Sequence, residues 1–250
     1  MNEFADRYGP WAVIAGASEG TGAAFAEALA AHGVDVVLVA RREAALEELA
    51  SRLPVSSRVV VLDLSDIDAG DRLAAATADL DVGLLVFNAG ADDHSTPMLD
   101  QPLDDLRALV RRNCSTVLDA CHQIGGRIVE RGRGGVILVT SGAAWAGGGN
   151  IAAYGATKAF DLLLAEALWA EWRPRGVDVQ ALVLGARPTR PRCAACSPSA
   201  ADRSASWPTP PTSSASRWST SPRGRSGSAA CPTRRAARRS ERCRAATPWS

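Results

Sequence analysis

The single lysine of this 250-residue chain, Lys158, lies four positions after one of its two tyrosines, Tyr154. In a helix, residues four apart project from the same face, so the phenol and the ammonium would be neighbours. A free phenol loses its proton only near pH ~10, and an adjacent positive charge stabilises the phenolate. Ser141, thirteen residues before Tyr154, adds a hydroxyl that can hydrogen-bond a substrate oxygen. These three residues therefore predict proton transfer at a substrate oxygen.

Short apolar runs alternate with longer segments rich in Ala, Leu, Glu and Arg. The runs predict strands at 11–15, 35–40, 58–62, 82–88, 135–140 and 178–184. The segments between them predict helices near 22–32, 43–53, 68–79, 103–130 and 154–173. Strands that are apolar on both faces and alternate with helices are typical of a parallel sheet covered on both sides. We therefore expect an α/β fold, a doubly wound parallel sheet of the Rossmann type, in one domain spanning residues 1–186.

A glycine-rich turn follows the first predicted strand and opens the first predicted helix. Its residues are Gly16, Ser18, Glu19, Gly20, Thr21 and Gly22. Small residues let the backbone approach a pyrophosphate, and the helix N-terminus supplies N–H groups to bind it. Such turns also serve helix packing alone, but the position between strand and helix favours a dinucleotide site.

The residue that ends the second strand reads the adenosine ribose in a fold of this kind. Arg41 and Arg42 follow that strand, whereas Asp35 lies at its start. Two cations at a helix N-terminus are poorly placed for the helix dipole, which favours a ligand role over a surface pair. We therefore expect NADP(H) to be preferred, with NAD(H) possible, although Glu19 adds negative charge nearby.

Two further short motifs follow predicted strands. Asp63 and Leu64 come after the third strand, and Asn88, Ala89 and Gly90 come after the fourth. Asp63 could simply cap the next helix, and the second motif could be an ordinary tight turn. Their position at the ligand-binding edge of the sheet makes them candidate cofactor contacts.

Over residues 10–186 the sequence resembles the short-chain dehydrogenase/reductase family. Gly16, Gly20 and Gly22 match the cofactor glycines of that family, although Ala15 stands where a Thr is usual and Thr21 where an Ile is usual. The resemblance implies that Asp63 contacts the adenine amino group and that residues 88–90 steady the sheet beneath the cofactor. It also implies that Gly185 lies at the cofactor.

The resemblance further implies a catalytic tetrad. Asn113 matches the family's asparagine that holds a water in the proton relay, and it joins Ser141, Tyr154 and Lys158. Hydride would pass between the nicotinamide and a carbonyl or alcohol carbon, with Tyr154 as the acid or base. Lys158 would also grip the nicotinamide ribose. The small-molecule substrate would be a 3-oxoacyl compound, a ketosteroid or another ketone, with Ser141, Tyr154 and Trp145 around it.

Two expectations about the surroundings accompany this interpretation. Trp145 could line an apolar substrate pocket or pack in the core. In the family, the helices near 103–130 and 154–173 often build a dimer or tetramer interface, so a homo-oligomer is expected.

Residues 187–250 differ sharply from the rest. They hold 13 Arg, one Asp and one Glu, a net charge of +11, against −10 for residues 1–186 with their 15 basic and 25 acidic side chains. They contain no Leu, Ile, Val, Met, Phe or Tyr. Such a segment cannot offset the entropy of ordering, so it is predicted to be a disordered tail.

Three interpretations of this tail remain open. Its residues have G/C-rich codons, and another reading frame from Arg187 permits the helix-like TDTPALRRLLAER, so a frameshift near residue 187 is one hypothesis. A second is that the chain as written is an inactive cofactor-binding remnant, because it lacks the substrate-covering segment and the last strand that the family resemblance implies. Nucleic-acid binding through the Arg residues is a less favoured alternative, and the prediction is no nucleic-acid partner.

The remaining features predict a cytoplasmic protein. The first residues, MNEFADRYGPW, form no export signal, and no apolar stretch reaches the ~18 residues of a membrane span. Cys114 and Cys121 are then two reduced thiols. Cys193 and Cys196 could form half a zinc site, but the tail has no His, so no metal is expected.

Overall fold

A computed structural model describes residues 3–92 and 95–185. The tail predicted from residue 187 therefore lies outside the described residues. The strands are β1 (Trp11–Ala15), β2 (Asp35–Ala40), β3 (Ser57–Val61), β4 (Val82–Phe87), β5 (Gly134–Ser141) and β6 (Val177–Leu184). The longer helices are α1 (Glu3–Tyr8), α2 (Gly20–Ala31), α3 (Glu43–Arg52), α4 (Ala69–Ala75), α5 (Leu103–Val110), α6 (Thr116–Ala120), α7 (Gly126–Arg131) and α8 (Ala152–Trp172).

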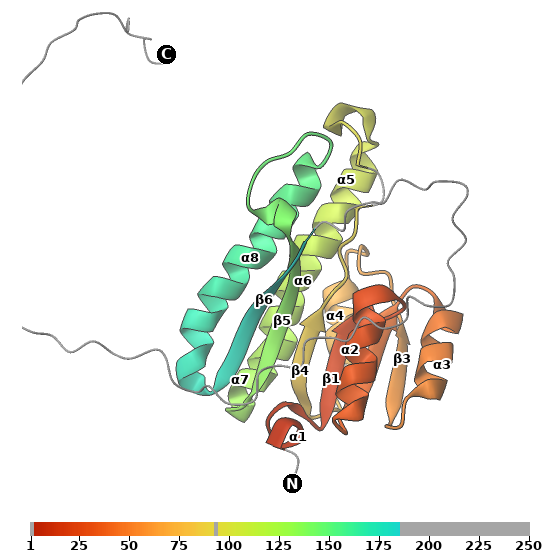
Figure 1. Cartoon of the computed structure of the whole chain (residues 1–250), viewed down its shortest axis with the longest axis vertical. Helices are drawn as coiled ribbons and strands as arrows, with labels where there is room; N and C mark the ends of the chain where they lie inside the picture. The colour runs from red at the N-terminus through yellow and green to blue at the C-terminus, as the bar shows by residue number, and fades with distance from the viewer. Residues whose placement is uncertain (1–2, 93–94, 186–250) are drawn as a thin grey trace, which may run out of the picture. The chain divides into compact units, whose positions relative to one another are not determined.

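The six strands form one sheet in the order β3-β2-β1-β4-β5-β6, and every neighbouring pair is parallel (Figure 1). The chain winds outward from β1 to β3 and then returns to the other side of β1 with β4. The strand order therefore reverses between β1 and β4, which is where ligands bind in open sheets of this kind. The predicted doubly wound, Rossmann-type fold is confirmed.

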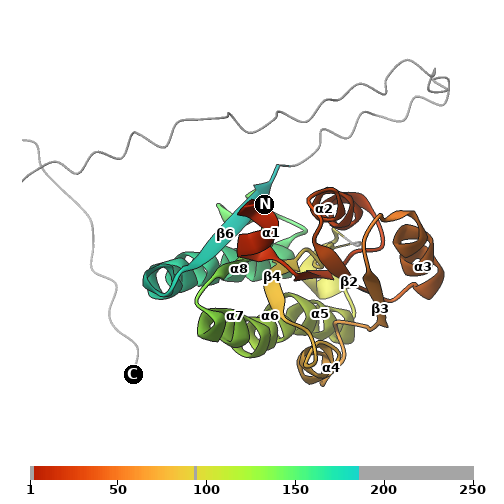
Figure 2. The ribbon, with the colours of Figure 1, turned by 90° about the horizontal axis from the view of Figure 1, so that it is seen from below.

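Helices cover both faces of this sheet (Figure 2). On one face, α2 and α3 pack on β1, β2 and β4 around Ile14, Leu38 and Leu46, with α1 at the amino-terminal edge of the strands. On the other face, α4, α6, α7 and α8 enclose a second apolar cluster that includes Leu85, Ile124 and Leu138. Strands that are buried on both sides explain the continuous apolar runs in the sequence.

The structure departs from the predicted elements in several places. The helix predicted at 68–79 is only α4, because Thr77 turns its hydroxyl back onto the Leu73 carbonyl, 3.0 Å away, and Arg127 binds the Thr77 carbonyl. The helix predicted at 103–130 is interrupted by two π-helical turns, η2 (Arg111–Ser115) and η3 (Cys121–Gly125). Helix α1 was not predicted.

Three general features of the described residues concern membrane spans, metal ions and thiols. None of the helices within 3–92 and 95–185 is long and apolar enough to cross a membrane. In the same residues, no group of three or more His, Cys, Asp or Glu side chains could hold a metal ion. Cys114 and Cys121 are free thiols, and Cys121 is buried.

Candidate active site

The turn after β1 is shaped by close contacts between backbones. Gly16 has a φ of +87°, which favours glycine, and a Cβ there would lie 2.8 Å from the Ala89 nitrogen. A Cβ on Gly22 would lie 2.0 Å from the Gly16 oxygen. The Asn88 side chain donates a hydrogen bond of 2.9 Å to that same oxygen. Asn88 and the two glycines therefore tie the ends of β1 and β4 to the start of α2.

A cavity of about 250 Å³ opens beside this turn, at the carboxyl ends of the strands. Ten of its lining residues are predicted cofactor contacts: Gly16, Ser18, Glu19, Arg41, Arg42, Asp63, Leu64, Asn88, Ala89 and Gly90. Ala40, Leu62, Ala91 and Arg112 also line it and were not predicted. The residues predicted separately after β1, β2, β3 and β4 therefore meet around one cavity.

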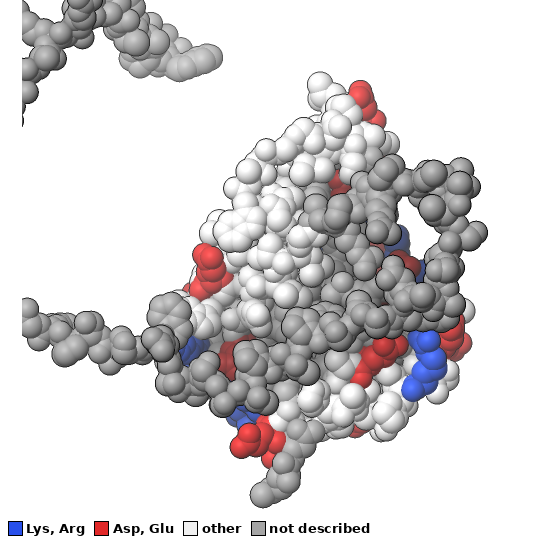
Figure 3. Space-filling view, in the orientation of Figure 1, with Lys and Arg blue, Asp and Glu red and all other residues white. Residues whose placement is uncertain are grey.

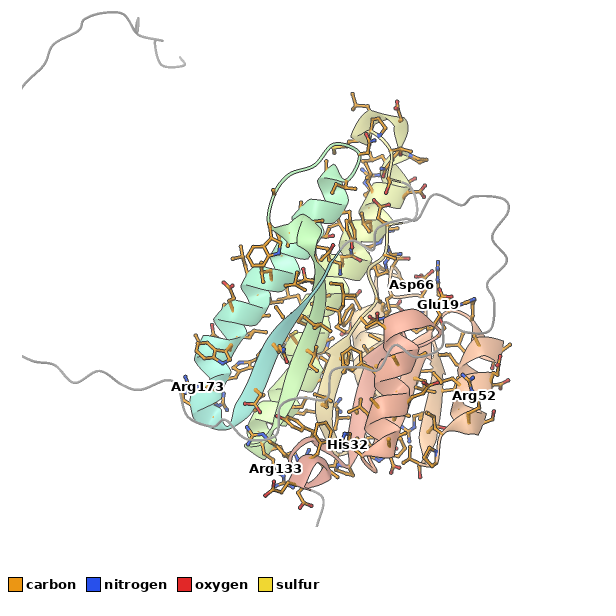
Figure 4. The ribbon with its side chains drawn as sticks, viewed as in Figure 1. Glu19, His32, Arg52, Asp66, Arg133 and Arg173 are labelled. Carbon is orange, nitrogen blue, oxygen red and sulfur yellow. The ribbon has the colours of Figure 1, made fainter. Side chains whose placement is uncertain are left out.

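The exposed charges at the mouth of this cavity form pairs. Arg42 lies 2.8 Å from a Glu19 carboxylate oxygen and donates a hydrogen bond of 3.3 Å to the Ser18 hydroxyl. Arg41 approaches Asp63 at 3.9 Å. Figure 3 shows acidic and basic side chains gathered beside α2 and α3. Figure 4 places Glu19 at the start of α2, at the same end of the sheet as Asp66 and opposite His32 and Arg133. The charge that Glu19 was expected to add is thus directed at Arg42.

Asp63 does not cap the next helix, because α4 begins only at Ala69. One of its carboxylate oxygens instead accepts hydrogen bonds from the Ser65 backbone, 2.9 Å, and the Ser65 hydroxyl, 2.7 Å. Partial burial raises the pKa of Asp63, but these hydrogen bonds and the nearby Arg41 and Arg112 outweigh burial and lower it. An ionised carboxylate at the end of β3 is an acceptor for an amino group.

Asn113 lies in the π-helical turn η2 and is fully buried. Its amide nitrogen donates a hydrogen bond to the Thr157 hydroxyl at 2.9 Å and a longer one to the Gly90 carbonyl at 3.4 Å. Thr157 in turn donates to the Tyr154 carbonyl. Asn113 is therefore joined to the β4 end on one side and to the first turns of α8 on the other.

Lys158 is only 3% exposed. Its ammonium donates to the Val139 carbonyl of β5 at 2.9 Å and to a carboxylate oxygen of Asp161 at 3.0 Å. A Cβ on Gly90 would lie 2.5 Å from the Lys158 nitrogen, so the glycine leaves the space that the ammonium occupies. Lys158 is thus held beneath the cavity by β4, β5 and α8.

Ser141 and Tyr154 lie where β5 and α8 meet. Ser141 is the last residue of β5, rather than just beyond the strand as predicted, and its hydroxyl accepts a hydrogen bond from the Ala143 nitrogen. The neighbouring Thr140 donates to the Lys158 carbonyl at 2.6 Å, which ties the strand end to α8. Tyr154 is half-buried, and its hydroxyl has no hydrogen-bond partner among the described residues. The phenol is therefore free to bond a ligand.

Some predicted residues stand apart from this group. Trp145 is 69% exposed, so it is not packed in the core. Gly20, Thr21, Gly22 and Gly185 do not line the cavity. Gly20, at the first position of α2, has a φ of +58°, and a Cβ there would meet no atom within 4 Å, while Gly22 acts through packing.

Sequence reasoning missed Arg112, Thr157 and Asp161. Arg112 donates a hydrogen bond of 2.6 Å to the Ala91 carbonyl, and both residues line the cavity. Its position next to Asn113 was a usable signal. Thr157 lies three residues after Tyr154, and Asp161 lies three residues after Lys158, so each is one turn along the helix from a predicted catalytic residue. Their burial could not be read from the sequence, because most polar helix residues face water.

Comparisons with known proteins agree with this geometry. The sequence model described as short chain dehydrogenase matches residues 10–193. The chain belongs to the short-chain dehydrogenase family. Family members are oxidoreductases, and the match spans all six strands. The family expected from Ser141, Tyr154 and Lys158 is confirmed.

Several relatives from this family are dehydrogenases or reductases. A 7beta-hydroxysteroid dehydrogenase of Mediterraneibacter gnavus is 36% identical over 72% of this chain and 70% of its own length. A very-long-chain 3-oxoacyl-CoA reductase of Homo sapiens is 31% identical over 70% of this chain and 58% of its own length. An inactive hydroxysteroid dehydrogenase-like protein 1 of Mus musculus is 34% identical over 71% of this chain and 56% of its own length.

Solved structures give the same assignment. A structure from a study of 7beta-hydroxysteroid dehydrogenase stereoselectivity has a TM-score of 0.69 and 36% identity, covering 73% of each chain. A short-chain dehydrogenase from Sphingobium yanoikuyae in complex with NADPH has a TM-score of 0.67 and 31% identity, covering 70% of this chain and 71% of its own.

Proposed function

We propose that the chain transfers hydride between NADP(H) and the carbonyl or alcohol carbon of a small-molecule substrate, with Asn113, Ser141, Tyr154 and Lys158 as its catalytic residues. The observation that carries the proposal is the combination, on one helix, of a buried Lys158 and a Tyr154 hydroxyl that has no hydrogen-bond partner within residues 3–92 and 95–185. That helix is tied to the end of β5 beside Ser141. A phenol without a hydrogen-bond partner among the described residues, four positions before a buried ammonium, suits proton transfer at a substrate oxygen.

The residues around the cavity fit a dinucleotide. Gly16 and Gly22 allow backbone contacts that any Cβ would block, and α2 starts at the cavity edge with free N–H groups. The Asp63 carboxylate would accept a hydrogen bond from the adenine amino group. Gly90, which has no side chain, would leave room for the cofactor beside Lys158. The bound nicotinamide cofactor would supply or accept the hydride.

The chain's own residues would handle the proton. Tyr154 would hold a proton at its hydroxyl oxygen and give it to, or take it from, the substrate oxygen. Lys158 would stabilise the phenolate by its charge. Ser141 would bind the same substrate oxygen and orient it. Asn113, buried against Thr157, would keep the first turns of α8 in register with the β4 end and hold a water for the relay.

Arg41 and Arg42 support a preference for NADP(H) over NAD(H). Both cations line the cavity after β2, where the ribose of the adenosine would lie. Arg42 already binds one anionic group, the Glu19 carboxylate, at 2.8 Å. A 2′-phosphate carries more negative charge than a carboxylate and would replace it on Arg42.

The substrate is proposed to be a hydroxysteroid, a 3-oxoacyl thioester or another bulky ketone. Large apolar side chains are exposed near the predicted substrate side, including Trp145 at 69% and Leu184 at 37%. Figure 3 shows a largely uncharged surface over the upper part of α8 and the loop before it. The names of the hydroxysteroid and 3-oxoacyl-CoA relatives support the same class.

We also propose that the chain forms a homo-oligomer in the cytoplasm. A groove of about 360 Å³ between α6, α7 and α8 has a largely apolar lining that includes Leu164, Leu168 and Trp172. Helices that expose such a groove are suited to pack against a second copy. Residues 187–250 are proposed to be a separate low-complexity segment that arises from a frameshift.

A catalytically silent cofactor-binding protein is the second candidate. The relative named as inactive is similar over the same part of the chain. Under this alternative the protein would bind NADPH and turn over no ketone.

The deciding experiment is a substrate survey with the purified full chain and with a chain whose gene is corrected by one base near codon 187. NADPH consumption would be followed with a ketosteroid, a 3-oxoacyl thioester and a bulky aryl ketone, with product measured in parallel. Ketone loss that equals NADPH loss supports the proposal. NADPH binding without turnover in both chains would establish the silent alternative, and failure to bind NADPH would overturn both.

A further inference from the structure

Asp161 is a buried carboxylate that the proposed mechanism does not use. It lies one turn after Lys158 in α8 and is 3% exposed. One of its oxygens accepts the Lys158 hydrogen bond of 3.0 Å, while the other is buried without a hydrogen-bond partner among the described residues. Pairs three residues apart on a helix usually lie at the surface and contribute little. A buried carboxylate is costly, so its presence here requires a specific partner or task.

We propose that Asp161 is a positioning residue for the reaction, which holds the Lys158 ammonium against β5 and balances its charge beneath Tyr154. The inference rests on the proposed function, because it assigns Asp161 a part in stabilising the Tyr154 phenolate. An ammonium has three N–H groups. The Val139 carbonyl and Asp161 take two of them, which leaves one for the cavity.

The charge balance follows from this geometry. An ionised Asp161 and a protonated Lys158 together carry no net charge, so the pair stabilises a phenolate less than Lys158 would alone. Protonation of Asp161 leaves the ammonium uncompensated and strengthens its effect on Tyr154. Burial raises the pKa of Asp161 to about 6, in spite of the opposing attraction of Lys158. The balance therefore changes within the range of physiological pH.

Few other ionisable groups act on Asp161. Strand β5 and the turn Gly142–Ala144 bring none, and β6 brings only Asp178, which is bound to Arg7 and Tyr8. The titratable side chains of the remaining neighbouring elements are Asp104, Asp105, Arg107, Arg111, Arg112, Cys114, Cys121, His122, Arg173 and Arg175. Burial, and then the Asp161 charge, raise the pKa of Cys114 to about 11 and that of Cys121 to about 12, so both thiols stay neutral. Lys158 is thus the main charged partner.

The first arm of the test compares the pH profiles of kcat for alcohol oxidation by the unmodified full chain, Asp161→Asn and Asp178→Asn. Asparagine keeps the shape and a hydrogen-bond acceptor for Lys158 but removes the charge. We expect the rising limb for Asp161→Asn to move to lower pH by about one unit, because a single neighbouring charge shifts an ionisation by about this much. Asp178→Asn makes the same chemical change outside the site and should leave the limb in place. Asp161→Glu, which restores the carboxylate, should return it.

The second arm needs no turnover, so it separates this inference from the proposed function. A carboxyl whose pKa is about 6 in the folded chain and ~3.9 in the unfolded chain stabilises the fold fully below pH ~4. That contribution is lost as the pH rises through 6. As the pH rises from 4 to 7, the unfolding midpoint of the unmodified chain should therefore decrease relative to that of Asp161→Asn. The midpoint of Asp178→Asn should instead follow that of the unmodified chain over this pH range.

The outcomes are distinct. A pH profile that Asp161→Asn leaves unmoved, in an active enzyme, overturns the inference. If no variant turns over any substrate, the plots of unfolding midpoint against pH decide. Parallel plots for the unmodified chain and Asp161→Asn overturn the inference. Plots that diverge as expected support the charge balance between Asp161 and Lys158, and then only the proposed function is refuted. Should Asp161→Asn fail to fold, Asp161→Ser takes its place in both arms.

Discussion

The two halves of the candidate site hold their polar groups in opposite ways. At the ends of β1 and β2, the charges are exposed: the side chains of Arg42 and Glu19 are 58% and 77% accessible. Behind β5, the side chains of Lys158 and Asp161 are each 4% accessible. Exposed ion pairs contribute little and exchange partners easily, whereas buried ones are fixed by the cost of leaving either partner alone.

This difference suits two different tasks. A group that must bind a charged ligand has to release its present partner at small cost, as Arg42 can release Glu19. A group that sets the proton affinity of Tyr154 has to keep its place. Substitutions in the two halves should therefore fail in different ways, those in the buried half through the chemistry and those in the exposed half through cofactor affinity.

The largest effect is expected from Tyr154→Phe. Loss of the proton donor should lower kcat by about a thousandfold, the range of general acid–base catalysis. NADPH binding, measured by nicotinamide fluorescence, should stay unchanged. The unfolding free energy should also stay within about 0.5 kcal/mol, because the Tyr154 hydroxyl forms no hydrogen bond with the described residues.

Tyr8→Phe is the matched control, because it removes the only other tyrosine hydroxyl. That hydroxyl donates to Asp178 at 2.6 Å, far from the site in sequence. The control should cost about 1 kcal/mol of stability and leave turnover intact. Retained turnover in Tyr154→Phe would remove Tyr154 from the mechanism.

Gly22→Ala should give the next largest effect. Its Cβ would meet the Gly16 oxygen at 2.0 Å and the Asn88 amide at 2.8 Å, so α2 would have to move away from β1. We expect a loss of about 3 kcal/mol in a chemical denaturation experiment, as for strongly overpacked sites, together with weaker NADPH binding. Gly126→Ala, in α7 with nothing within 4 Å of the new Cβ, should be neutral or stabilising. Equal effects of the two substitutions would contradict the close packing at Gly22.

The fold and the outline of the site could be predicted because their signals are local. Apolar runs such as those of β1 and β4 mark strands buried on both faces, and Tyr154 and Lys158 share a helix face by spacing alone. The strand-end residues converge because parallel strands end at one edge of the sheet.

What could not be predicted depends on contacts between distant segments. Asn113, in its π-helical turn, donates hydrogen bonds to Gly90 and Thr157, which lie 23 and 44 residues away. From the sequence, Asp161 is predicted to be an exposed acidic residue on a helix. It is buried because α8 packs on β5. The ion pair between Arg42 and Glu19 could not be predicted, because it depends on the shape of the turn after β1.

In the exposed half, Arg42→Ala should raise the KM for NADPH about tenfold and leave that for NADH within twofold. The reason is the loss of one charge-assisted contact to a phosphate, ~1.4 kcal/mol. Arg52→Ala is the control, since Arg52 lies at the far end of α3 and, among the described residues, pairs loosely with Glu27 at 3.9 Å. A parallel rise in both KM values would mean that Arg42 serves the structure of the turn rather than the 2′-phosphate.

The smallest effect, and the one with the opposite sign, is expected from Glu19→Gln. Removal of this carboxylate frees Arg42 from its 2.8 Å ion pair and takes a negative charge from the place proposed for the phosphate. Exposed pairs are worth at most about 1 kcal/mol, so the KM for NADPH should fall by about two- to fivefold, and less at high salt because the charges are screened. NADH, which lacks the phosphate, should show no such gain. In the Arg42→Ala background most of the gain should disappear, because the cation that Glu19 occupies is no longer there. A gain of equal size in that background would show that Glu19 repels the phosphate directly, and that the exposed pair is not what the cofactor displaces.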